Sequence, residues 1–112
     1  MKKAAYAEFI KRLPLANLPV AGVNAYLLTG PQAQAAFFEL PAGASVPPHA
    51  HGEQWGIIVE GEIDLTIGGV THLLKRGDSY YIGDQVVHSG ITHTGCLAID
   101  VFADPNRYQA RD

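Results

Sequence analysis

Two histidines one residue apart, followed by a short polar segment, are the residues of this chain best suited to chemistry. His49 and His51 lie on one face if the backbone there is extended, because strand side chains alternate with a period of two. Gly52 and Glu53 are typical of a two-residue type II′ hairpin loop, which would place Gln54 opposite His51. Imidazole is a good ligand for zinc, copper, iron and nickel. The segment therefore predicts a transition-metal site.

Short strands are the elements that must position these residues. Twelve glycines and seven prolines in 112 residues indicate frequent turns. Apolar and alternating runs between these turns predict strands at 25–29, 34–40, 46–51, 54–60, 63–67, 70–74, 79–82, 86–91 and 97–102. Helical spacing of the apolar residues in 4–13 predicts a short N-terminal helix, and Asp104-Pro105 predicts a short C-terminal helical turn. The pattern as a whole is typical of an antiparallel all-β sandwich or barrel.

Composition narrows the class of protein. A chain of 112 residues predicts one domain. A formal charge of −3 and a pI of about 5.9 argue against a nucleic-acid partner. No apolar run is long enough to span a membrane, and Cys96 is the single cysteine, which excludes an intrachain disulfide. A cytoplasmic protein is therefore expected.

The spacing around the histidines resembles the two motifs of the cupin superfamily. The first motif reads glycine, five residues, His-x-His, a few residues, Glu or Gln, six residues, glycine; it matches Gly43, His49, His51, Gln54 and Gly61. The second keeps a glycine and a histidine in register, Gly77 and His88, while Gly83, Gln85 and Thr92 replace its Pro, Gly and Asn. The resemblance implies a double-stranded β-helix, or jelly roll. It predicts a single cupin domain over 1–112, with a barrel core at about 24–103 and an N-terminal cover segment at 1–20.

The resemblance also implies a ligand set for one divalent transition metal: His49, His51, Gln54 and His88. Zinc, nickel, manganese, iron and copper all stay open. Glu53 is an alternative fourth ligand, but a residue inside a two-residue turn points away from the paired face, which favours Gln54. Three imidazoles and an amide leave the charge of the metal uncompensated, so an anionic ligand such as a carboxylate or enolate is expected. Gly56 either leaves room for that ligand or marks a close strand contact.

A proton carrier would complete an enzyme. Asp100 shares a face with Phe102 on the last strand, and small cupins that act on unsaturated uronates are similar in having a glutamine ligand and a late-strand aspartate near the metal. One of the adjacent Tyr80 and Tyr81 is expected to point inward, and Tyr81 is the second catalytic candidate. Arg107 is interpreted as a surface residue that could also reach a carboxylate.

Two classes of function follow from these interpretations. The first is a metal-dependent enzyme on a small oxygenated or carboxylate-bearing molecule, either a sugar-acid-type isomerase, tautomerase or lyase, or a dioxygenase. The second is a non-catalytic module that binds or senses a small molecule. Both faces of the predicted strand 54–60 are largely apolar, and cupins commonly dimerise, so a homodimer is also expected.

Overall fold

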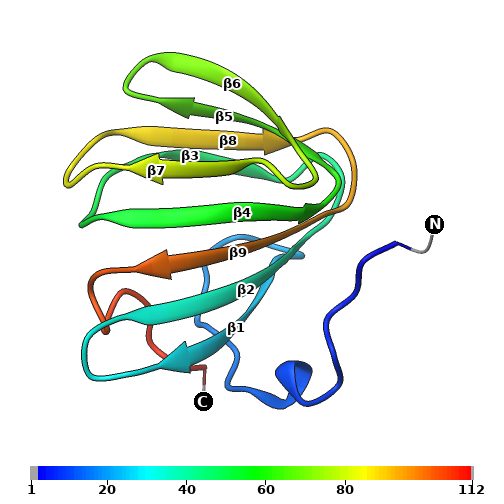
Figure 1. Cartoon of the computed structure of the whole chain (residues 1–112), viewed down its shortest axis with the longest axis vertical. Helices are drawn as coiled ribbons and strands as arrows, with labels where there is room; N and C mark the ends of the chain where they lie inside the picture. The colour runs from blue at the N-terminus through cyan, green and yellow to red at the C-terminus, as the bar shows by residue number, and fades with distance from the viewer. Residues whose placement is uncertain (1–2, 112) are drawn as a thin grey trace.

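The computed structural model describes residues 3–111, and within that range nine strands form two antiparallel sheets that face each other (Figure 1). The five-stranded sheet has the order β1 (Asn24–Thr29), β2 (Gln34–Leu40), β9 (Cys96–Phe102), β4 (Gln54–Glu60) and β7 (Ser79–Ile82). The four-stranded sheet has the order β3 (Ser45–His49), β8 (His88–Thr92), β5 (Glu62–Ile67) and β6 (Val70–Lys75). This arrangement confirms the predicted jelly roll. The outermost residues of the predicted domain and cover segment, 1, 2 and 112, lie outside the described residues.

Turn chemistry explains several of the strand ends. β5 and β6 form a hairpin through Gly68 and Gly69, both of which have positive φ, as a type I′ turn requires. Pro47 and Pro48 lie in β3, which is an edge strand of its sheet, so their missing N–H groups interrupt no central ladder.

The hairpin predicted at Gly52-Glu53 is wrong. β3 pairs with β8 in the four-stranded sheet, whereas β4 pairs with β7 and β9 in the other sheet. Residues 50–53 therefore cross from one sheet to the other, and Gly52 does not have the positive φ of a type II′ turn. His51 consequently lies in this crossing segment, beyond the end of β3.

The predicted N-terminal helix is reduced to a 3-10 turn, η1 (Ile10–Arg12). Tyr6 lies before this turn, in a segment without regular secondary structure, where its hydroxyl donates to the carbonyls of Phe38 and Ala98, at 2.9 and 3.2 Å. Tertiary packing of this one ring thus overrides the local helical spacing. At the other end, Asp104 caps a turn through the N–H of Asn106, at 2.8 Å, but no helix follows. Among the helices of residues 3–111, none has the length and apolar character needed to cross a bilayer.

Strand register arranges the interior of the barrel in three layers along the five-stranded sheet. The first layer contains Gln34, Gln54, Ile82 and Phe102, which are cross-strand neighbours. The second layer contains Ala36, Gly56, Tyr80 and Asp100. The third layer contains Phe38, Ile58 and Ala98. The small residues of the second and third layers leave a cavity of about 120 Å³ between the sheets. Leu18 and Val20 of the N-terminal cover segment, and Val23 just after it, also line this cavity.

The outer face of the five-stranded sheet carries a row of exposed apolar side chains. Leu28, Ala35, Val101, Trp55 and Tyr81 are consecutive cross-strand neighbours from β1 to β7. All but Ala35 are exposed large side chains. The homodimer expected from the sequence stays a prediction. This row is the surface that a second copy would bury, because a two-fold interface joins the same patch on both subunits.

Replacing Trp55 with glutamate is expected to turn the predicted dimer into a monomer, because a charge within the row would be buried without a partner. Light scattering at about 10 µM protein gives the mass. The control is Leu73→Glu, which changes a residue of 50% exposure on β6, in the other sheet. A monomeric mass for the unmodified chain would contradict the prediction.

Candidate metal centre

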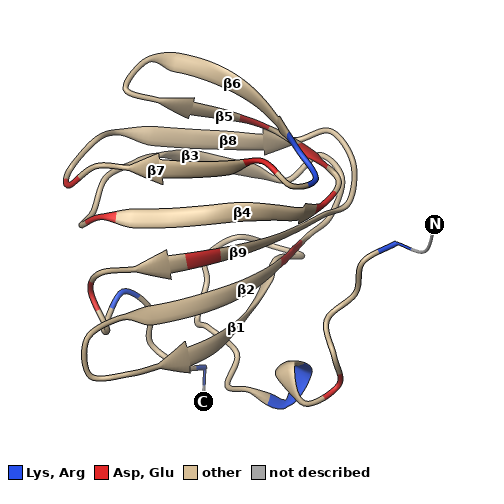
Figure 2. Ribbon diagram, viewed as in Figure 1, with Lys and Arg blue, Asp and Glu red and all other residues tan. Residues whose placement is uncertain are grey.

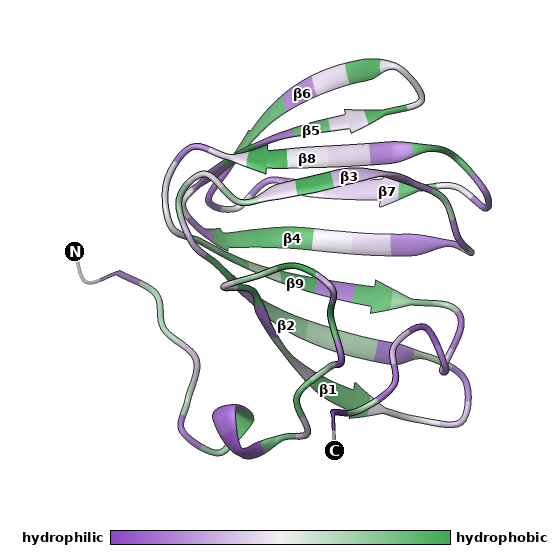
Figure 3. Cartoon of the chain, turned by 180° about the vertical axis from the view of Figure 1, so that it is seen from behind, coloured by the Kyte–Doolittle hydropathy of each residue, from purple (hydrophilic) through white to green (hydrophobic). Residues whose placement is uncertain are grey.

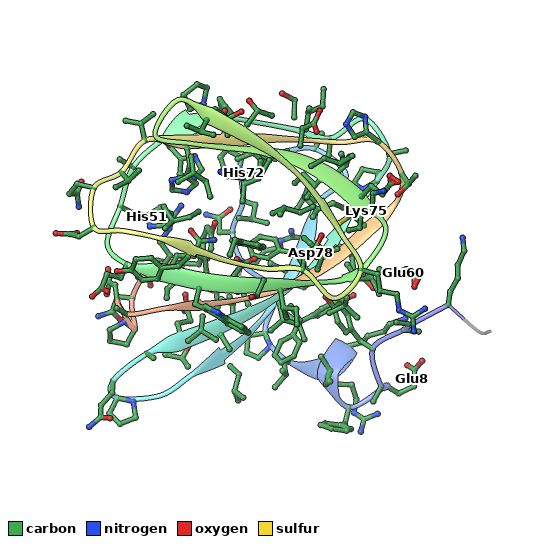
Figure 4. The ribbon with its side chains drawn as sticks, turned by 45° about the horizontal axis from the view of Figure 1, so that its top comes forward. Glu8, His51, Glu60, His72, Lys75 and Asp78 are labelled. Atoms are coloured by element: carbon green, nitrogen blue, oxygen red, sulfur yellow. The ribbon has the colours of Figure 1, made fainter. Side chains whose placement is uncertain are left out.

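Three histidines meet at one end of the barrel interior. His49 ends β3 and lies directly opposite His88, which begins β8. His51 approaches from the segment that crosses between the sheets, and Figure 4 shows its side chain inside the space that the strands enclose. One ring nitrogen from each residue lies within 4.8 Å of the others. The predicted convergence of these three residues is therefore confirmed, although a sheet crossing rather than a hairpin produces it.

Backbone carbonyls select the tautomer of all three imidazoles. The Nδ1 atoms of His49, His51 and His88 lie 2.9, 2.8 and 2.9 Å from the carbonyl oxygens of Pro47, Gly52 and Val86, respectively. A carbonyl only accepts hydrogen bonds, so each Nδ1 carries the proton. Each Nε2 is then left with a lone pair, and a hydrogen bond of this kind from the second ring nitrogen is typical of metal-bound histidines.

Burial favours the neutral form of His51 and His88. Desolvation lowers the pKa of His51 to about 4 and also lowers the pKa of His88. Among the described residues, neither the Nε2 of His51 nor that of His88 has a hydrogen-bond partner, although both atoms are buried. Two orphaned lone pairs are costly in a protein interior. A bound cation would satisfy them, so the three histidines fit a divalent transition metal.

Gln54 brings an amide to the same site from the start of β4. Its Nε2 donates to Asp100 Oδ1 at 2.8 Å, and its Oε1 is buried with no partner in the described part of the chain. The hydrogen bond fixes the amide so that its oxygen remains available. Glu53, the rejected alternative, is exposed and accepts a hydrogen bond from Tyr81 at the surface. The geometry thus favours Gln54 over Glu53 as a ligand.

Asp100 lies inside the cavity, two residues along β9 from Phe102. It is 4% exposed, and its Oδ1 accepts hydrogen bonds from Gln54 and from the hydroxyl of Tyr80, the latter at 2.7 Å. Desolvation raises the pKa of Asp100 to about 6, while the two hydrogen bonds act in the opposite direction. Figure 2 shows this acidic stretch within β9, away from the charged residues at the strand ends.

Tyr80, not Tyr81, is the tyrosine that lines the cavity. Tyr81 is 58% exposed on the outer face, so its position does not support the catalytic role predicted for it. The signal for the correct choice was present in the sequence. Ile82 is an apolar strand residue that faces the core, and Tyr80 lies two residues before it and hence on the same face.

Gly56 is a close-contact position. A Cβ built at Gly56 would overlap Asp100 Oδ1 and the hydroxyl end of Tyr80. Of the two interpretations of this glycine, the structure therefore supports close packing across strands, because protein side chains already occupy the space beside it. The missing side chain lets Tyr80 and Asp100 meet above β4.

Gly56→Ala is expected to destabilise the fold by about 1–3 kcal/mol, because the new methyl group must displace a buried hydrogen-bonded pair. Thermal unfolding of the metal-free protein measures this change. Gly30→Ala is the matched control, since a Cβ there would meet its nearest neighbour, the carbonyl oxygen of Ala33, at 3.7 Å. Equal melting temperatures for the two variants would contradict the packing argument.

Arg107 is the second residue that the sequence interpretation misplaced. Its guanidinium lies over the ring of Tyr108 at 4.2 Å and over that of Phe102 at 5.7 Å, and both rings line the cavity. Its buried Nε has no hydrogen-bond partner within residues 3–111. Its charge also contributes to the lowered pKa values of His51 and His88. Arg107 thus places a positive charge beside the histidine end of the cavity, a tertiary effect that no local pattern encodes.

Comparison with known proteins agrees with this fold. A family model described as a cupin domain matches residues 36–102, so the chain belongs to the cupin family. The chain is similar to a protein named H2HPP isomerase from Bacillus subtilis, with 32% identity over 84 residues. The match covers 71% of this chain and 36% of the isomerase, so the chain spans about a third of the length of that relative.

Solved structures of cupins superpose on most of the chain. An RmlC-like cupin from Shewanella frigidimarina has a TM-score of 0.79 and 28% identity, with 96% of each chain covered. KdgF from a Halomonas species has a TM-score of 0.74 and 24% identity, covering 82% of this chain and 88% of KdgF. Salicylate 1,2-dioxygenase from Pseudoaminobacter salicylatoxidans has a TM-score of 0.73 and 20% identity, covering 79% of this chain and 26% of that enzyme. The last two similarities show the fold alone.

Proposed function

We propose that the protein is a metal-dependent enzyme that moves a proton on a small carboxylate-bearing molecule, as an isomerase or tautomerase. One observation carries the proposal: a buried carboxyl group, Asp100, shares a cavity with three histidines arranged for a metal. A module that only binds or senses a ligand has no need for a buried carboxyl group there, since burying one is costly. The similarity to an isomerase supports the same class of reaction.

The metal would be held by the Nε2 atoms of His49, His51 and His88 and by the Oε1 of Gln54. This donor set suits zinc, nickel, manganese, iron or copper. When bound, such a metal would act as a Lewis acid towards a carbonyl or enolate oxygen. The orphaned Nε2 and Oε1 atoms support the assignment of these ligands.

An anionic ligand fits the charges of the site. The four donor groups are neutral, so they leave the charge of a divalent cation uncompensated. Arg107 adds a further positive charge beside Phe102, and its unpartnered Nε is available to an acceptor. A carboxylate is the simplest anion that can use both the metal and a guanidinium.

Asp100 would take the proton from a carbon next to the carbonyl of the ligand and return it to another position. Tyr80 and Gln54 both donate to Oδ1, and no residue that the structure describes donates to Oδ2. The first oxygen therefore fixes the carboxyl group, and the second stays free to accept and release a proton. Tyr80 acts here as a positioning residue.

Exchange of carbon-bound protons tests the proposal without knowledge of the natural substrate. The protein is purified without chelator, its metal content is measured, and a panel of 2-oxo acids is incubated with it in heavy water. Loss of the proton signal next to the carbonyl, faster than with chelated protein, is the expected result. Oxygen uptake without exchange would point to a dioxygenase instead. Binding of the panel with neither reaction would support the non-catalytic alternative.

A further inference from the structure

The cavity changes character along its length. Its polar lining side chains come from the histidine end or from the layer of Tyr80 and Asp100. Beyond that layer the lining is apolar and includes Phe38, Leu40, Ile58, Ile63, Leu65 and Ala98. Figure 3 shows the same change along β4, which runs from a hydrophilic start beside the crossing segment to a hydrophobic second half.

The four-stranded sheet contributes to this apolar wall because of a glycine. Gly90 lies between His88 and Thr92 on β8, opposite Leu65. A Cβ at Gly90 would approach the side chain of Ile63 to 3.1 Å and that of Leu65 to 3.6 Å. The absent side chain lets these two aliphatic groups extend over β8 and face the cavity.

Thr92 follows Gly90 on the same face of β8, and its hydroxyl already makes two hydrogen bonds within the protein. Its Oγ1 donates to the carbonyl of Pro41 at 2.6 Å and accepts from the N–H of Ala44 at 2.9 Å. It does not line the cavity. Ligand hydroxyl groups that entered this half would therefore lose their water and find no side-chain partner, which opposes binding.

We infer that the site takes a carboxylate whose carbon skeleton is apolar, about the size of a phenyl ring or a branched alkyl group. The inference rests on the proposed function, which places the carboxylate at the histidine end. The volume of about 120 Å³ includes the histidine end and so limits the skeleton to a small group, because an aliphatic cavity of roughly 150 Å³ in another protein accepts one benzene. The apolar class thus takes the place of the sugar-acid class expected from the sequence.

A series of carboxylates of equal charge tests the inference. Cobalt(II)-loaded protein serves as a spectroscopic probe, and it is titrated with acetate, butanoate, 4-methylpentanoate, 3-phenylpropanoate and gluconate. Burial of each added methylene should lower Kd about fourfold. Burial of the phenyl group should lower Kd roughly 10- to 100-fold relative to acetate. Gluconate should bind no more tightly than acetate.

The variant Ala98→Val tests the contribution of the apolar part of the cavity lining. The added methyl groups project into the third layer, so the advantage of 3-phenylpropanoate over acetate should fall at least tenfold while the affinity for acetate stays unchanged. Ala35→Val, on the outer face of the same sheet, is the matched control and should change neither affinity. If Ala98→Val fails to fold, the carboxylate titrations of the wild-type protein still test the inference.

The outcomes separate the two proposals. If none of the carboxylates changes the cobalt spectrum, the anionic ligand of the proposed function is wrong. If acetate changes the spectrum but Kd does not fall along the apolar series, or if gluconate binds most tightly, the apolar class is wrong and the proposed function stands.

Discussion

His88→Ala is expected to weaken metal binding about 100-fold or more, because it removes one of the three Nε2 donors from the centre. In other proteins, loss of a residue that only hydrogen-bonds to a metal ligand weakens metal binding about 10- to 100-fold. Loss of a ligand itself should weaken metal binding at least as much. Metal content after dialysis against a weak chelator gives the result. The melting temperature should fall on chelation of the wild-type protein and should not respond to chelation in the variant.

Two other histidines of the chain provide the controls for this variant. His72 is exposed on β6, and His93 is exposed and paired with Asp64 at 2.8 Å. Both lie outside the cavity lining, so His72→Ala and His93→Ala should keep their metal. If His88→Ala retains stoichiometric metal, the assignment of the three histidines as metal ligands is wrong.

Asp100→Asn is expected to keep the metal and to lose proton exchange by a factor of about 10² to 10⁴, the usual contribution of general acid–base catalysis. The amide oxygen of asparagine can still accept the hydrogen bonds from Tyr80 and Gln54, so the cavity should keep its shape. What the variant lacks is a carboxylate that accepts a proton. The rate of exchange in heavy water, normalised to bound metal, is the measurement.

Asp64→Asn is the matched control for this second variant, since Asp64 pairs with His93 outside the cavity. It should exchange protons at the wild-type rate. If Asp100→Asn also exchanges at that rate, Asp100 has only a structural role. A variant that has lost its metal would instead show that the bond from Gln54 to Asp100 positions a ligand.

Motif spacing predicted the cluster of three histidines well. His49, His51 and His88 were recognisable because the fold requires glycines and histidines at set distances, whatever the residues between them. Strand positions were also predictable, since period-two alternation is a local property. β2, β4 and β7 have the predicted bounds, and the other strands differ by one or two residues at one or both ends.

Features that depend on long-range pairing were not predictable in the same way. Gly52-Glu53 has hairpin composition, yet the chain crosses to the other sheet there because β3 pairs with β8 and β4 with β9. Tyr6 leaves its helical pattern because two strand carbonyls accept its hydroxyl. Arg107 packs over Phe102 and Tyr108, two rings that line the cavity, and no sequence spacing records this stacking.

The layered interior separates two tasks that one cavity must perform. The histidine end and the second layer, with Tyr80 and Asp100, handle charge and protons, and the third layer shapes the space beyond. A mutation at the third level, such as one at Ile58 or Ala98, therefore changes which molecules fit without touching a donor atom. Such a barrel can acquire new substrates by stepwise substitution while its chemistry is conserved, which makes those positions the natural targets for redesign.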